Sequence, residues 1–302
     1  MGNEMNLKMF ILSGAIALAS AAHAQIWVSA SVGNDANTCS RGLPCRTFQK
    51  AINVAPLWGQ INVLDPGDYG SMTISQAITI DGGGLASNVS SSYYTAAITV
   101  QTPPGQVVQL RNMSIHGNGA YTGIFYTGSG QLVIENLKIN GFGGDCINAE
   151  MTGQGTSDLV IKDTSIDNCS SAGIEINGPQ ATTAEISNTH VHYANFGLSL
   201  HNGIVRVSDS SFSSPGPGSG SGIIAGAGGG PPVLMLDNCQ ISGYAVGIVV
   251  WTPSVIQLSR STIMNTGAAF QVNAGGTLIS NGNNSFLNNT SVGSFTKTVP
   301  LM

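Results

Sequence analysis

The eight residues VQLRNMSI at positions 108–115 recur as LVIENLKI at 132–139 and as LVIKDTSI at 159–166. Each copy has apolar residues at its first, third and last positions and Asn or Asp at its fifth. The pattern continues toward the C-terminus, with its last positions 21 to 29 residues apart. A repeat of this length predicts a solenoid, because one unit buries its apolar side chains only against the next unit. The last positions of the copies, called the anchors, are Ile115, Ile139, Ile166, Val191, Phe212, Ile241, Ile263 and Phe286.

Each repeat contains three predicted strands. The first and third positions lie two residues apart, so their side chains face the same side of a strand. The Asn or Asp marks a bend, since these residues tolerate a left-handed φ. The pattern fails once, at Asn281, while Ile279 is expected to fill the first position of that last copy. A loop after each anchor leads to a third strand, which is marked by Gly123-Ile124, Cys146-Ile147, Gly173-Ile174, Gly197-Leu198, Gly222-Ile223, Gly247-Ile248 and Ala269-Phe270.

Two other repeat architectures fit this pattern less well. A leucine-rich repeat needs a denser leucine pattern and usually a helix, but no helical periodicity separates the anchors. A β-propeller has a repeat of about 40 or more residues and antiparallel blades. The anchors therefore predict an all-β solenoid, a parallel β-helix, over residues 61–302.

Residues 25–60 are expected to form an N-terminal cap over the open end of the solenoid. Within residues 47–55, apolar side chains recur at helical spacing behind Thr47, a suitable N-cap. This pattern predicts an amphipathic capping α-helix. Cys39 and Cys45 enclose a loop of turn-forming residues and are expected to form a disulfide.

The N-terminal 24 residues have the pattern of a signal peptide. Lys8 precedes the apolar run 9–18, and Ala22-His23-Ala24 offers small residues where a signal peptidase reads, so we expect cleavage after Ala24. The run is shorter than the ~20 residues that cross a bilayer, so no membrane span is predicted. The mature protein is expected to be secreted, periplasmic or on the cell surface.

Composition narrows the class of partner. Charged residues make up 8% of the 302 residues and glycine contributes 40, while the net charge is −5 and no Lys/Arg run occurs. Nucleic acid is therefore excluded as a partner, because binding to its backbone needs clustered positive charge. Export also implies an oxidising compartment, in which Cys146 and Cys169 can pair and leave Cys239 as a buried free thiol. The alternative is that these three cysteines are small apolar core residues.

The N-terminal third resembles the opening of bacterial, secreted right-handed parallel β-helix proteins of the pectate-lyase-like superfamily. The resemblance implies a single-stranded right-handed β-helix, with a ligand groove along the outer face of the Gly-Ile strand. It specifies activity poorly, since lyases, hydrolases, epimerases, adhesins and phage tail proteins share this scaffold. The segments that carry it are Trp27-Val28-Ser29, Gly33-Asn34-Asp35, Pro44-Cys45-Arg46-Thr47-Phe48, Val63-Leu64-Asp65-Pro66-Gly67 and Ile78-Thr79-Ile80-Asp81-Gly82.

Side-chain alternation predicts two outward columns on this face. Glu150, Glu175 and His201 fall together and are the first candidates for acid–base catalysis. Stacking places the α-carbons of the two glutamates roughly 8 Å apart, a distance that does not exclude an inverting glycoside hydrolase. The competing interpretation is an ordinary solvated sheet surface. The first column is Phe125, Asn148, Glu175, Ser199, Ile224, Val249 and Gln271, and the second is Thr127, Glu150, Asn177, His201, Gly226, Trp251 and Asn273.

Four residues of these columns are candidates for substrate binding. The amides of Asn148 and Asn177 supply paired donors and acceptors for sugar hydroxyls. Trp251 offers an aromatic face for a sugar ring, and Phe125 lies in the same groove.

A second cluster is predicted on the strand that carries the anchors. Lys138 and His190 share one outward column, and the next holds His116, Asn140, Asp167 and His192. Asp167 and His192 stand on adjacent coils, where an imidazole–carboxylate pair is geometrically reasonable. Histidine ligation of a metal lacks a compact ligand spacing here, so the metal is left unknown. The alternative is structural hydrogen bonding.

One segment is similar to the polygalacturonases. Gly144-Asp145-Cys146-Ile147 is followed a coil later by Cys169-Ser170-Ser171-Ala172-Gly173. Those hydrolases have Asp-Asp-Cys and then Gly-His-Gly, so the resemblance implies a catalytic role for Asp145. Gly144 replaces the first Asp, Ala172 replaces the His, and the downstream Arg-Ile-Lys is missing, which puts that activity in doubt.

Polysaccharide lyases of this fold resemble one another in using Ca²⁺ and an Arg or Lys base. Neither Arg nor Lys occupies the groove columns, and the acidic cluster of Glu150 and Glu175 is thin for calcium. The sequence therefore identifies no cofactor.

Two hypotheses remain open. The first is an exported β-helix protein that binds or processes an extracellular polysaccharide, as a glycoside hydrolase or a polysaccharide lyase does. The second is a non-catalytic surface, adhesin or structural module. The sequence leaves the substrate and the oligomeric state unspecified.

Overall fold

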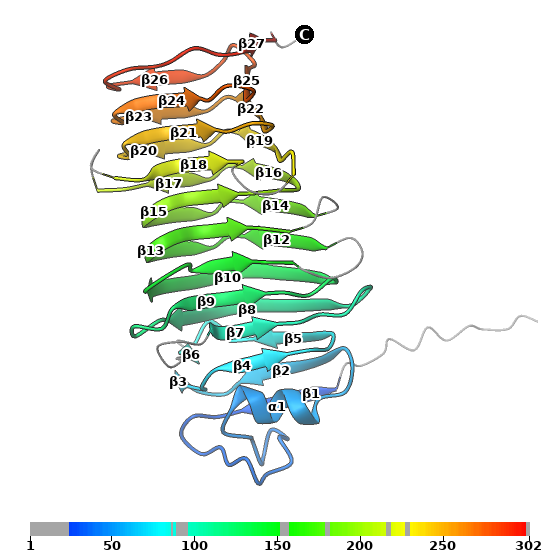
Figure 1. Cartoon of the computed structure of the whole chain (residues 1–302). Coiled ribbons are helices and arrows are strands. Elements are labelled where there is room, and N and C mark those ends of the chain that lie inside the picture. The colour runs from blue at the N-terminus through cyan, green and yellow to red at the C-terminus, as the bar shows by residue number, and fades with distance from the viewer. Residues whose placement is uncertain are drawn as a thin grey trace, which may run out of the picture.

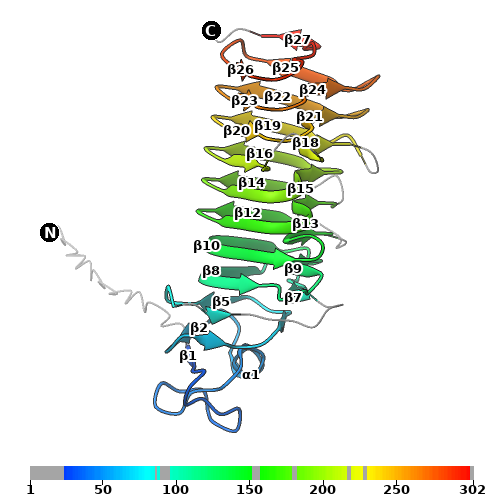
Figure 2. The ribbon, with the colours of Figure 1, turned by 90° about the vertical axis from the view of Figure 1, so that its left-hand side faces the viewer.

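Parallel strands stack along a single axis from the N-terminal cap to the C-terminal end (Figures 1 and 2). The computed structural model describes residues 24–85, 87–88, 96–151, 157–178, 182–215, 219–226 and 230–299. The signal peptide predicted for residues 1–24 lies, apart from its last residue, outside these ranges and stays a prediction. Within them, 25 strands form one hydrogen-bonded sheet that winds into a solenoid with three faces, here called A, B and C.

Each face is a ladder of parallel strands. Face A consists of β1 (Gln25–Val28), β2 (Gly59–Val63), β5 (Ile78–Asp81), the first parts of β8 (Val107–His116) and β10 (Gln131–Phe142), β12 (Asp158–Lys162), β14 (Thr183–Ser187), β16 (Ile204–Ser208), β19 (Val233–Asp237), β22 (Val255–Ser259), β25 (Thr277–Ser280) and β27 (Lys297–Thr298). Face B consists of the last parts of β8 and β10, the first parts of β13 (Ser165–Ile176) and β15 (His190–Leu200), β17 (Ser211–Ser213), β20 (Gln240–Ser242), β23 (Thr262–Met264) and β26 (Ser285–Leu287). Face C consists of β4 (Met72–Ile74), β7 (Ala96–Val100), β9 (Thr122–Tyr126), β11 (Ile147–Ala149), the last parts of β13 and β15, β18 (Ser221–Ala225), β21 (Val246–Val250) and β24 (Ala268–Val272). Two short strands, β3 (Gly67–Asp68) and β6 (Ser87–Asn88), pair separately.

The anchors form one continuous interior column, as the sequence predicts. Ile115 pairs with Ile139, Ile139 with Ile166, and the register continues without a break to Phe286. All anchors from Ile115 to Ile263 are buried. Burial of this repeated apolar column holds the coils together, since the coils above and below supply its only cover. The predicted all-β, single-stranded parallel β-helix is confirmed.

The last coil departs from the predicted register. Ile256 pairs with Leu278, and Leu258 pairs with Ser280, so Ile279 is not the inward residue. Leu278 is fully buried, whereas Ile279 points outward beside Gln257. The misfit at Asn281 therefore reflects one additional residue between face A and the anchor of this coil.

The residue at the bend between faces A and B has a left-handed backbone conformation in successive coils. Asn112, Asn136, Asp163 and Asn188 have φ of 55°, 52°, 53° and 43°. Their side chains also stack, since Asn136 Nδ2 donates to Asn112 Oδ1 at 2.8 Å and Asn188 Nδ2 donates to Asp163 Oδ1 at 2.7 Å. Residues that tolerate this conformation thus also satisfy their polar groups along the axis.

The glycine that opens a face C strand is required by close packing. A β-carbon at Gly197 would lie 2.5 Å from the carbonyl oxygen of Gly222 and 2.9 Å from the Phe212 ring. The carbonyl belongs to the next coil, so any side chain would force the coils apart.

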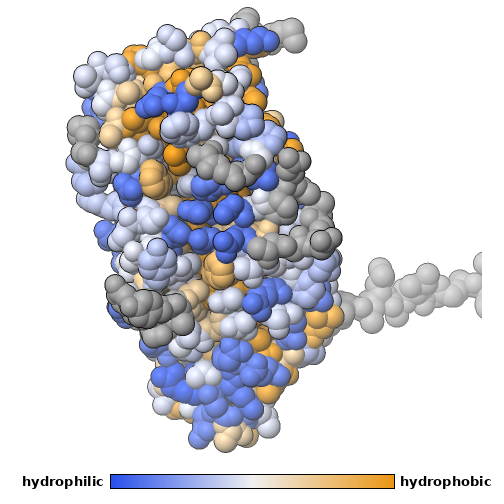
Figure 3. Space-filling view, in the orientation of Figure 1, coloured by the Kyte–Doolittle hydropathy of each residue, from blue (hydrophilic) through white to orange (hydrophobic). Residues whose placement is uncertain are grey.

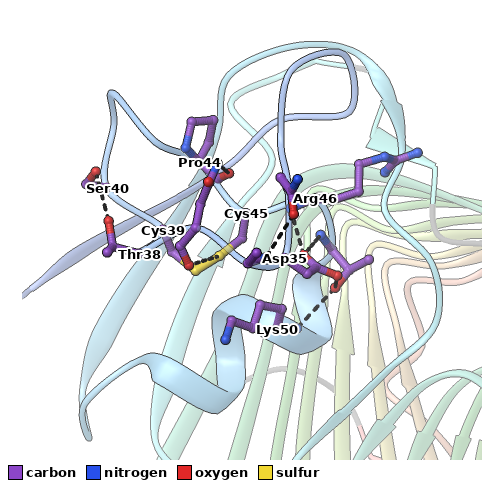
Figure 4. The surroundings of a disulfide bond; sticks show 12 residues. Asp35, Thr38, Cys39, Ser40, Pro44, Cys45, Arg46 and Lys50 are labelled. Carbon is purple, nitrogen blue, oxygen red and sulfur yellow. Dashed lines mark hydrogen bonds between the residues drawn. A yellow bond between two sulfur atoms is a disulfide. The ribbon is translucent and has the colours of Figure 1, made fainter.

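The cap closes the N-terminal end with a helix and a disulfide loop (Figure 4). The helix α1 (Phe48–Val54) begins behind Thr47, whose hydroxyl accepts the Lys50 amide at 3.1 Å. The Thr47 hydroxyl in turn donates to Asp35 at 2.9 Å. The predicted Cys39–Cys45 disulfide is present and the capping helix is confirmed. Strand β1, which lies within the predicted cap region 25–60, already pairs with β2 of the solenoid.

Aromatic side chains cover the C-terminal end. The rings of Phe270, Phe286 and Phe295 lie 4.7 to 5.8 Å apart between centroids. They pack together at the last coil that the structure describes, where they cover its apolar interior. Within the described ranges, no helix has the length and apolar character needed to cross a membrane.

Candidate active site on face C

The two predicted columns lie on face C in the expected register. Asn148 pairs with Phe125 on one side and Glu175 on the other, and Glu175 pairs with Ser199. The second column continues one step beyond the strand ends, since the His201 amide donates to the Ile176 carbonyl at 2.9 Å. The column positions follow from strand alternation, and this register stacks them one above another.

Asp145 joins this surface from the turn before β11. Its Oδ1 accepts the Ala172 amide of the next coil at 2.9 Å, and its Oδ2 accepts Asn148 Nδ2 at 2.9 Å. The adjacent residue forms the Cys146–Cys169 disulfide, which ties the same two coils together and confirms the predicted pair. Cys239 is free and buried. The Asp145 carboxylate is thus buried and held in place by both coils.

Glu175 is surrounded by groups that disfavour its charge. Burial raises the pKa of Glu175, and the negative charges of Asp145 and Glu150 raise it further. Its Oε1 lies 3.8 Å from His201 Nε2, but burial lowers the pKa of His201. Both shifts favour the neutral forms of the two side chains, so they weaken the ionic character of this contact. Glu175 is therefore a carboxylic acid that keeps its proton to a higher pH than an ordinary glutamate does.

An unpaired acceptor lies beside this acid. The Oδ1 atom of Asn148 is buried and has no hydrogen-bond partner in the described part of the chain. The next side chain in its column is Glu175. A buried acceptor without a donor is costly, so this oxygen is available to a protonated carboxyl or to a ligand hydroxyl.

His201 is positioned by a neighbouring hydroxyl. Its Nε2 lies 3.2 Å from Ser199 Oγ, and Ser199 is buried below it. Glu150 and Asn177, by contrast, are exposed at the strand ends. Trp251 lies further along the same column, separated from His201 by Gly226, and its side chain is 39% exposed. The structure thus brings Asp145, Asn148, Glu150, Glu175 and His201 together, while Phe125 and Trp251 lie along the same face on either side.

Figure 3 shows this face in the orientation of Figure 1. Hydrophilic residues gather in the middle of the face, over β13 and β15. Hydrophobic residues are interspersed above them, over β21 and β24.

Gly144 has a steric explanation. A β-carbon there would lie 2.8 Å from Cε1 of the Tyr121 ring and 2.8 Å from the Tyr121 carbonyl oxygen. Tyr121 thus occupies the space that a first Asp of a polygalacturonase-like Asp-Asp-Cys segment would need. Tyr121 was not predicted from the sequence. The one sequence feature that pointed to it was Gly144, where a side chain would collide with the Tyr121 ring.

The second predicted cluster, on face B, is held by other partners. Asp167 and His192 do pair in register on adjacent coils. His192 Nδ1 lies 2.9 Å from Ser213 Oγ, and His190 Nδ1 lies 2.9 Å from Ser211 Oγ. Among the described residues, no ion pair joins Asp167 to His192. This arrangement fits the structural hydrogen bonding that the sequence left as the alternative.

The surface hollows of the described residues lie away from the candidate site on face C. Hollows of about 460 and 430 Å³ lie on face A, where they share Met235 and Asp237. Asp237 is ion-paired with Arg260 there. Searching the described ranges finds no group of three or more His, Cys, Asp or Glu side chains arranged to hold a metal ion.

Comparisons with known proteins agree with this architecture. A family model described as "Right handed beta helix region" matches residues 61–204. The crystal structure of pectate lyase Pel9A is 14% identical, with 91% of this chain and 78% of that chain covered and a TM-score of 0.66. An alginate lyase from Paenibacillus sp. str. FPU-7 is 13% identical, with 89% and 99% covered and a TM-score of 0.64. A GH136 lacto-N-biosidase from Eubacterium ramulus is 10% identical, with 92% and 68% covered and a TM-score of 0.58. No curated protein sequence matches the chain. The chain has the right-handed parallel β-helix fold that these solved structures share.

Proposed function

We propose that face C binds an extracellular polysaccharide and cleaves it by acid–base catalysis at the cluster of Asp145, Glu150, Glu175 and His201. One observation carries this proposal: Glu175 is half-buried beside two other carboxyl groups, and its burial and their charges raise its pKa. Two carboxyl groups with separated pKa values are the requirement for dividing acid and base roles.

Glu175 is the proposed general acid. It donates its proton to the leaving glycosidic oxygen as the bond to the anomeric carbon breaks. Glu150, which is exposed at the strand end, takes a proton from the attacking water, whose oxygen forms the new bond to that carbon. The stacking distance of about 8 Å between their α-carbons does not exclude the carboxyl separation that an inverting hydrolase needs for that water. Asp145 is a positioning residue, because its charge helps to raise the pKa of Glu175.

The surrounding groups suit a sugar ligand. Asn148 Oδ1 is an acceptor that a sugar hydroxyl can satisfy. Asn177 and Trp251 offer an amide and an aromatic ring on the same face. Two of the similar structures are named as lyases of pectate and alginate, which supports a polysaccharide as the ligand class. Elimination is less well supported, because neither Arg nor Lys occurs in the two columns of face C.

We also propose that the protein is exported. The two disulfides support an oxidising compartment, since such bonds are rare in a reducing cytosol. A mass measurement of the protein isolated from its host tests this directly. Cleavage after Ala24 is the expected result, and recovery of the intact chain from the cytosol contradicts the proposal.

A screen of acidic and neutral polysaccharides tests the activity. New reducing ends indicate hydrolysis, and ultraviolet absorbance from unsaturated uronates indicates elimination. Glu175→Gln should lower turnover about 10²–10⁴-fold. Glu185→Gln is the matched control, because Glu185 is an exposed glutamate on β14 of face A. Absence of both products would leave the non-catalytic surface module as the function. Full activity in Glu175→Gln and Glu150→Gln would show that these residues are not the catalytic pair.

A further inference from the structure

The corner between faces B and C contains an unusual tyrosine. Most residues at this corner are Gly or Asn with left-handed φ, but Tyr193 occupies the position on its coil with φ of 54°. The register fixes this equivalence, since Asn168 and Tyr193 directly precede the paired residues Cys169 and Ala194. The other positions are Gly141 at 81°, Asn168 at 53°, Gly243 at 77°, Asn265 at 54° and Asn288 at 52°.

The conformation of Tyr193 is not compensated by local contacts. A bulky side chain in the left-handed region is a genuine outlier, whereas Gly and Asn adopt it readily. The Tyr193 side chain is 54% exposed, so burial recovers little. Its hydroxyl makes no hydrogen bond, and its ring contacts no other aromatic ring, among the residues that the structure describes. An uncompensated outlier of this kind points to function.

Tyr193 lies on the side of the acidic cluster that Asp145 occupies. It lies three residues before Phe196, which pairs with Ala172, the residue whose amide binds Asp145. A second exposed tyrosine lies on the other side along the axis. Tyr121 is 56% exposed, and its ring contacts Gly144, which directly precedes Asp145.

The two tyrosines are separated along the solenoid axis by a distance that suits an extended ligand. Tyr121 leads into β9 and Tyr193 lies in β15, with β11 and β13 stacked between them. Three stacking steps place them roughly 14 Å apart along the axis. The acidic cluster lies between these two levels.

We infer that Tyr121 and Tyr193 are platforms on which sugar rings stack, one on each side of the acidic cluster, so that a polysaccharide chain runs along the axis beside this corner. The inference rests on the proposed function and adds the binding residues and the direction of the chain. Aromatic rings provide large contact areas with little loss of rotamer freedom, which suits them to an exposed binding surface. The strained backbone at Tyr193 persists because the ring is needed there.

Tyr193→Asn in the Glu175→Gln background tests the inference without turnover. Calorimetric titration with pectate and alginate oligosaccharides measures affinity, and thermal melting measures stability. We expect affinity to fall about tenfold, equivalent to about 1.4 kcal/mol. The melting temperature should rise, because Asn fits the left-handed corner. Tyr193→Phe should keep the affinity, since it keeps the ring.

Asn265→Gly is the matched control, because Asn265 occupies the same corner far from the cluster. Its affinity should equal that of the parent. Unchanged affinity in Tyr193→Asn, or no rise in its melting temperature, overturns the inference. The activity of Glu175→Gln tests the proposed function separately. If the parent binds neither oligosaccharide, the inference and the proposed ligand class fail together.

Discussion

Asp65 ties the chain after β1 to the first complete coil, and its replacement by Asn should destabilise the cap. The carboxylate accepts the Ser29 hydroxyl at 2.7 Å, the Ala30 amide at 2.7 Å and the Ser31 amide at 3.1 Å. It also accepts the Tyr69 hydroxyl at 2.7 Å and the Ser31 hydroxyl. One side chain thus satisfies donors from two segments that are far apart in sequence.

The size of the effect follows from which donors lose a partner. In Asp65→Asn, the remaining carbonyl oxygen can still accept the Ala30 amide and the buried Tyr69 hydroxyl. Ser31 is exposed, so water can replace its partner. The fully buried Ser29 loses a charged acceptor, and such a hydrogen bond is worth about 1.5–3 kcal/mol. We expect a loss of about 2 kcal/mol, which lowers the melting temperature by about 5 °C.

The loss should depend on pH. Burial raises the pKa of Asp65, but hydrogen bonds from Ser31, Tyr69 and Ser29 outweigh it and hold that pKa well below its ordinary value of 3.8. The folded protein therefore binds this proton less readily than the unfolded chain does. The stabilisation is complete above about pH 4 and disappears as the pH falls toward the folded pKa.

Thermal melts followed by circular dichroism at about pH 7 and about pH 3 measure both effects. The gap between wild type and Asp65→Asn should be largest near neutrality and shrink in acid. Glu185→Gln controls for loss of a surface carboxylate. A gap below about 0.5 kcal/mol at neutral pH, or one that does not change with pH, refutes the argument, since ordinary surface substitutions stay within that range.

Three further predictions concern face C. Asp145→Asn removes one of the charges that raise the pKa of Glu175. The alkaline limb of the pH–activity profile should therefore move to lower pH. An unchanged limb would contradict the proposed role of Asp145. Glu175→Gln should raise the melting temperature above about pH 5 and leave it unchanged in acid. The reason is that the raised pKa of Glu175 lowers the stability of the wild type as the pH rises through that pKa. Equal melting temperatures of wild type and variant at all pH values would contradict this prediction. Gly197→Ala should cost about 2 kcal/mol in denaturant unfolding, because its β-carbon would lie 2.5 Å from the Gly222 carbonyl oxygen. Gly42→Ala, with nothing within 4 Å of its β-carbon, is the matched control and should be neutral.

The fold was predictable because stacking repeats one local pattern. Each inward residue pairs with its equivalent in the next coil, so the period alone aligned Ile115 with Ile139 and Ile166. The period failed at the last coil, where Leu278 replaced Ile279 at the inward position. A single additional residue leaves no distinct sequence signal except the misfit at Asn281.

The site was only partly predictable for a related reason. Strand alternation placed Asn148 and Glu175 in one column, and the register confirms that placement. Asp145 lies in a turn, where alternation has no meaning, and it entered as a candidate through the polygalacturonase-like segment. Tyr193 gave no signal at all, because a left-handed corner is predicted from Asn or Gly and not from an aromatic residue.

Faces A and C differ in how they accommodate charged side chains at adjacent levels of the solenoid. Stacked coils place side chains of adjacent levels about 4.8 Å apart, so like charges in register repel strongly. Face A resolves this with opposite charges: Asp81 pairs with Arg111 at 2.8 Å, Glu135 with Lys162 at 3.1 Å, and Asp237 with Arg260.

On face C the carboxyl groups of Asp145, Glu150 and Glu175 act on one another, and no Lys or Arg within the described ranges forms an ion pair with them. A lysine in the face C columns could pair with these carboxyl groups, as Lys162 pairs with Glu135 on face A. The pKa of Glu175 is instead raised, so Glu175 holds its proton to a higher pH beside the fixed Asp145 carboxyl group. That pair is what acid–base cleavage of a glycosidic bond requires.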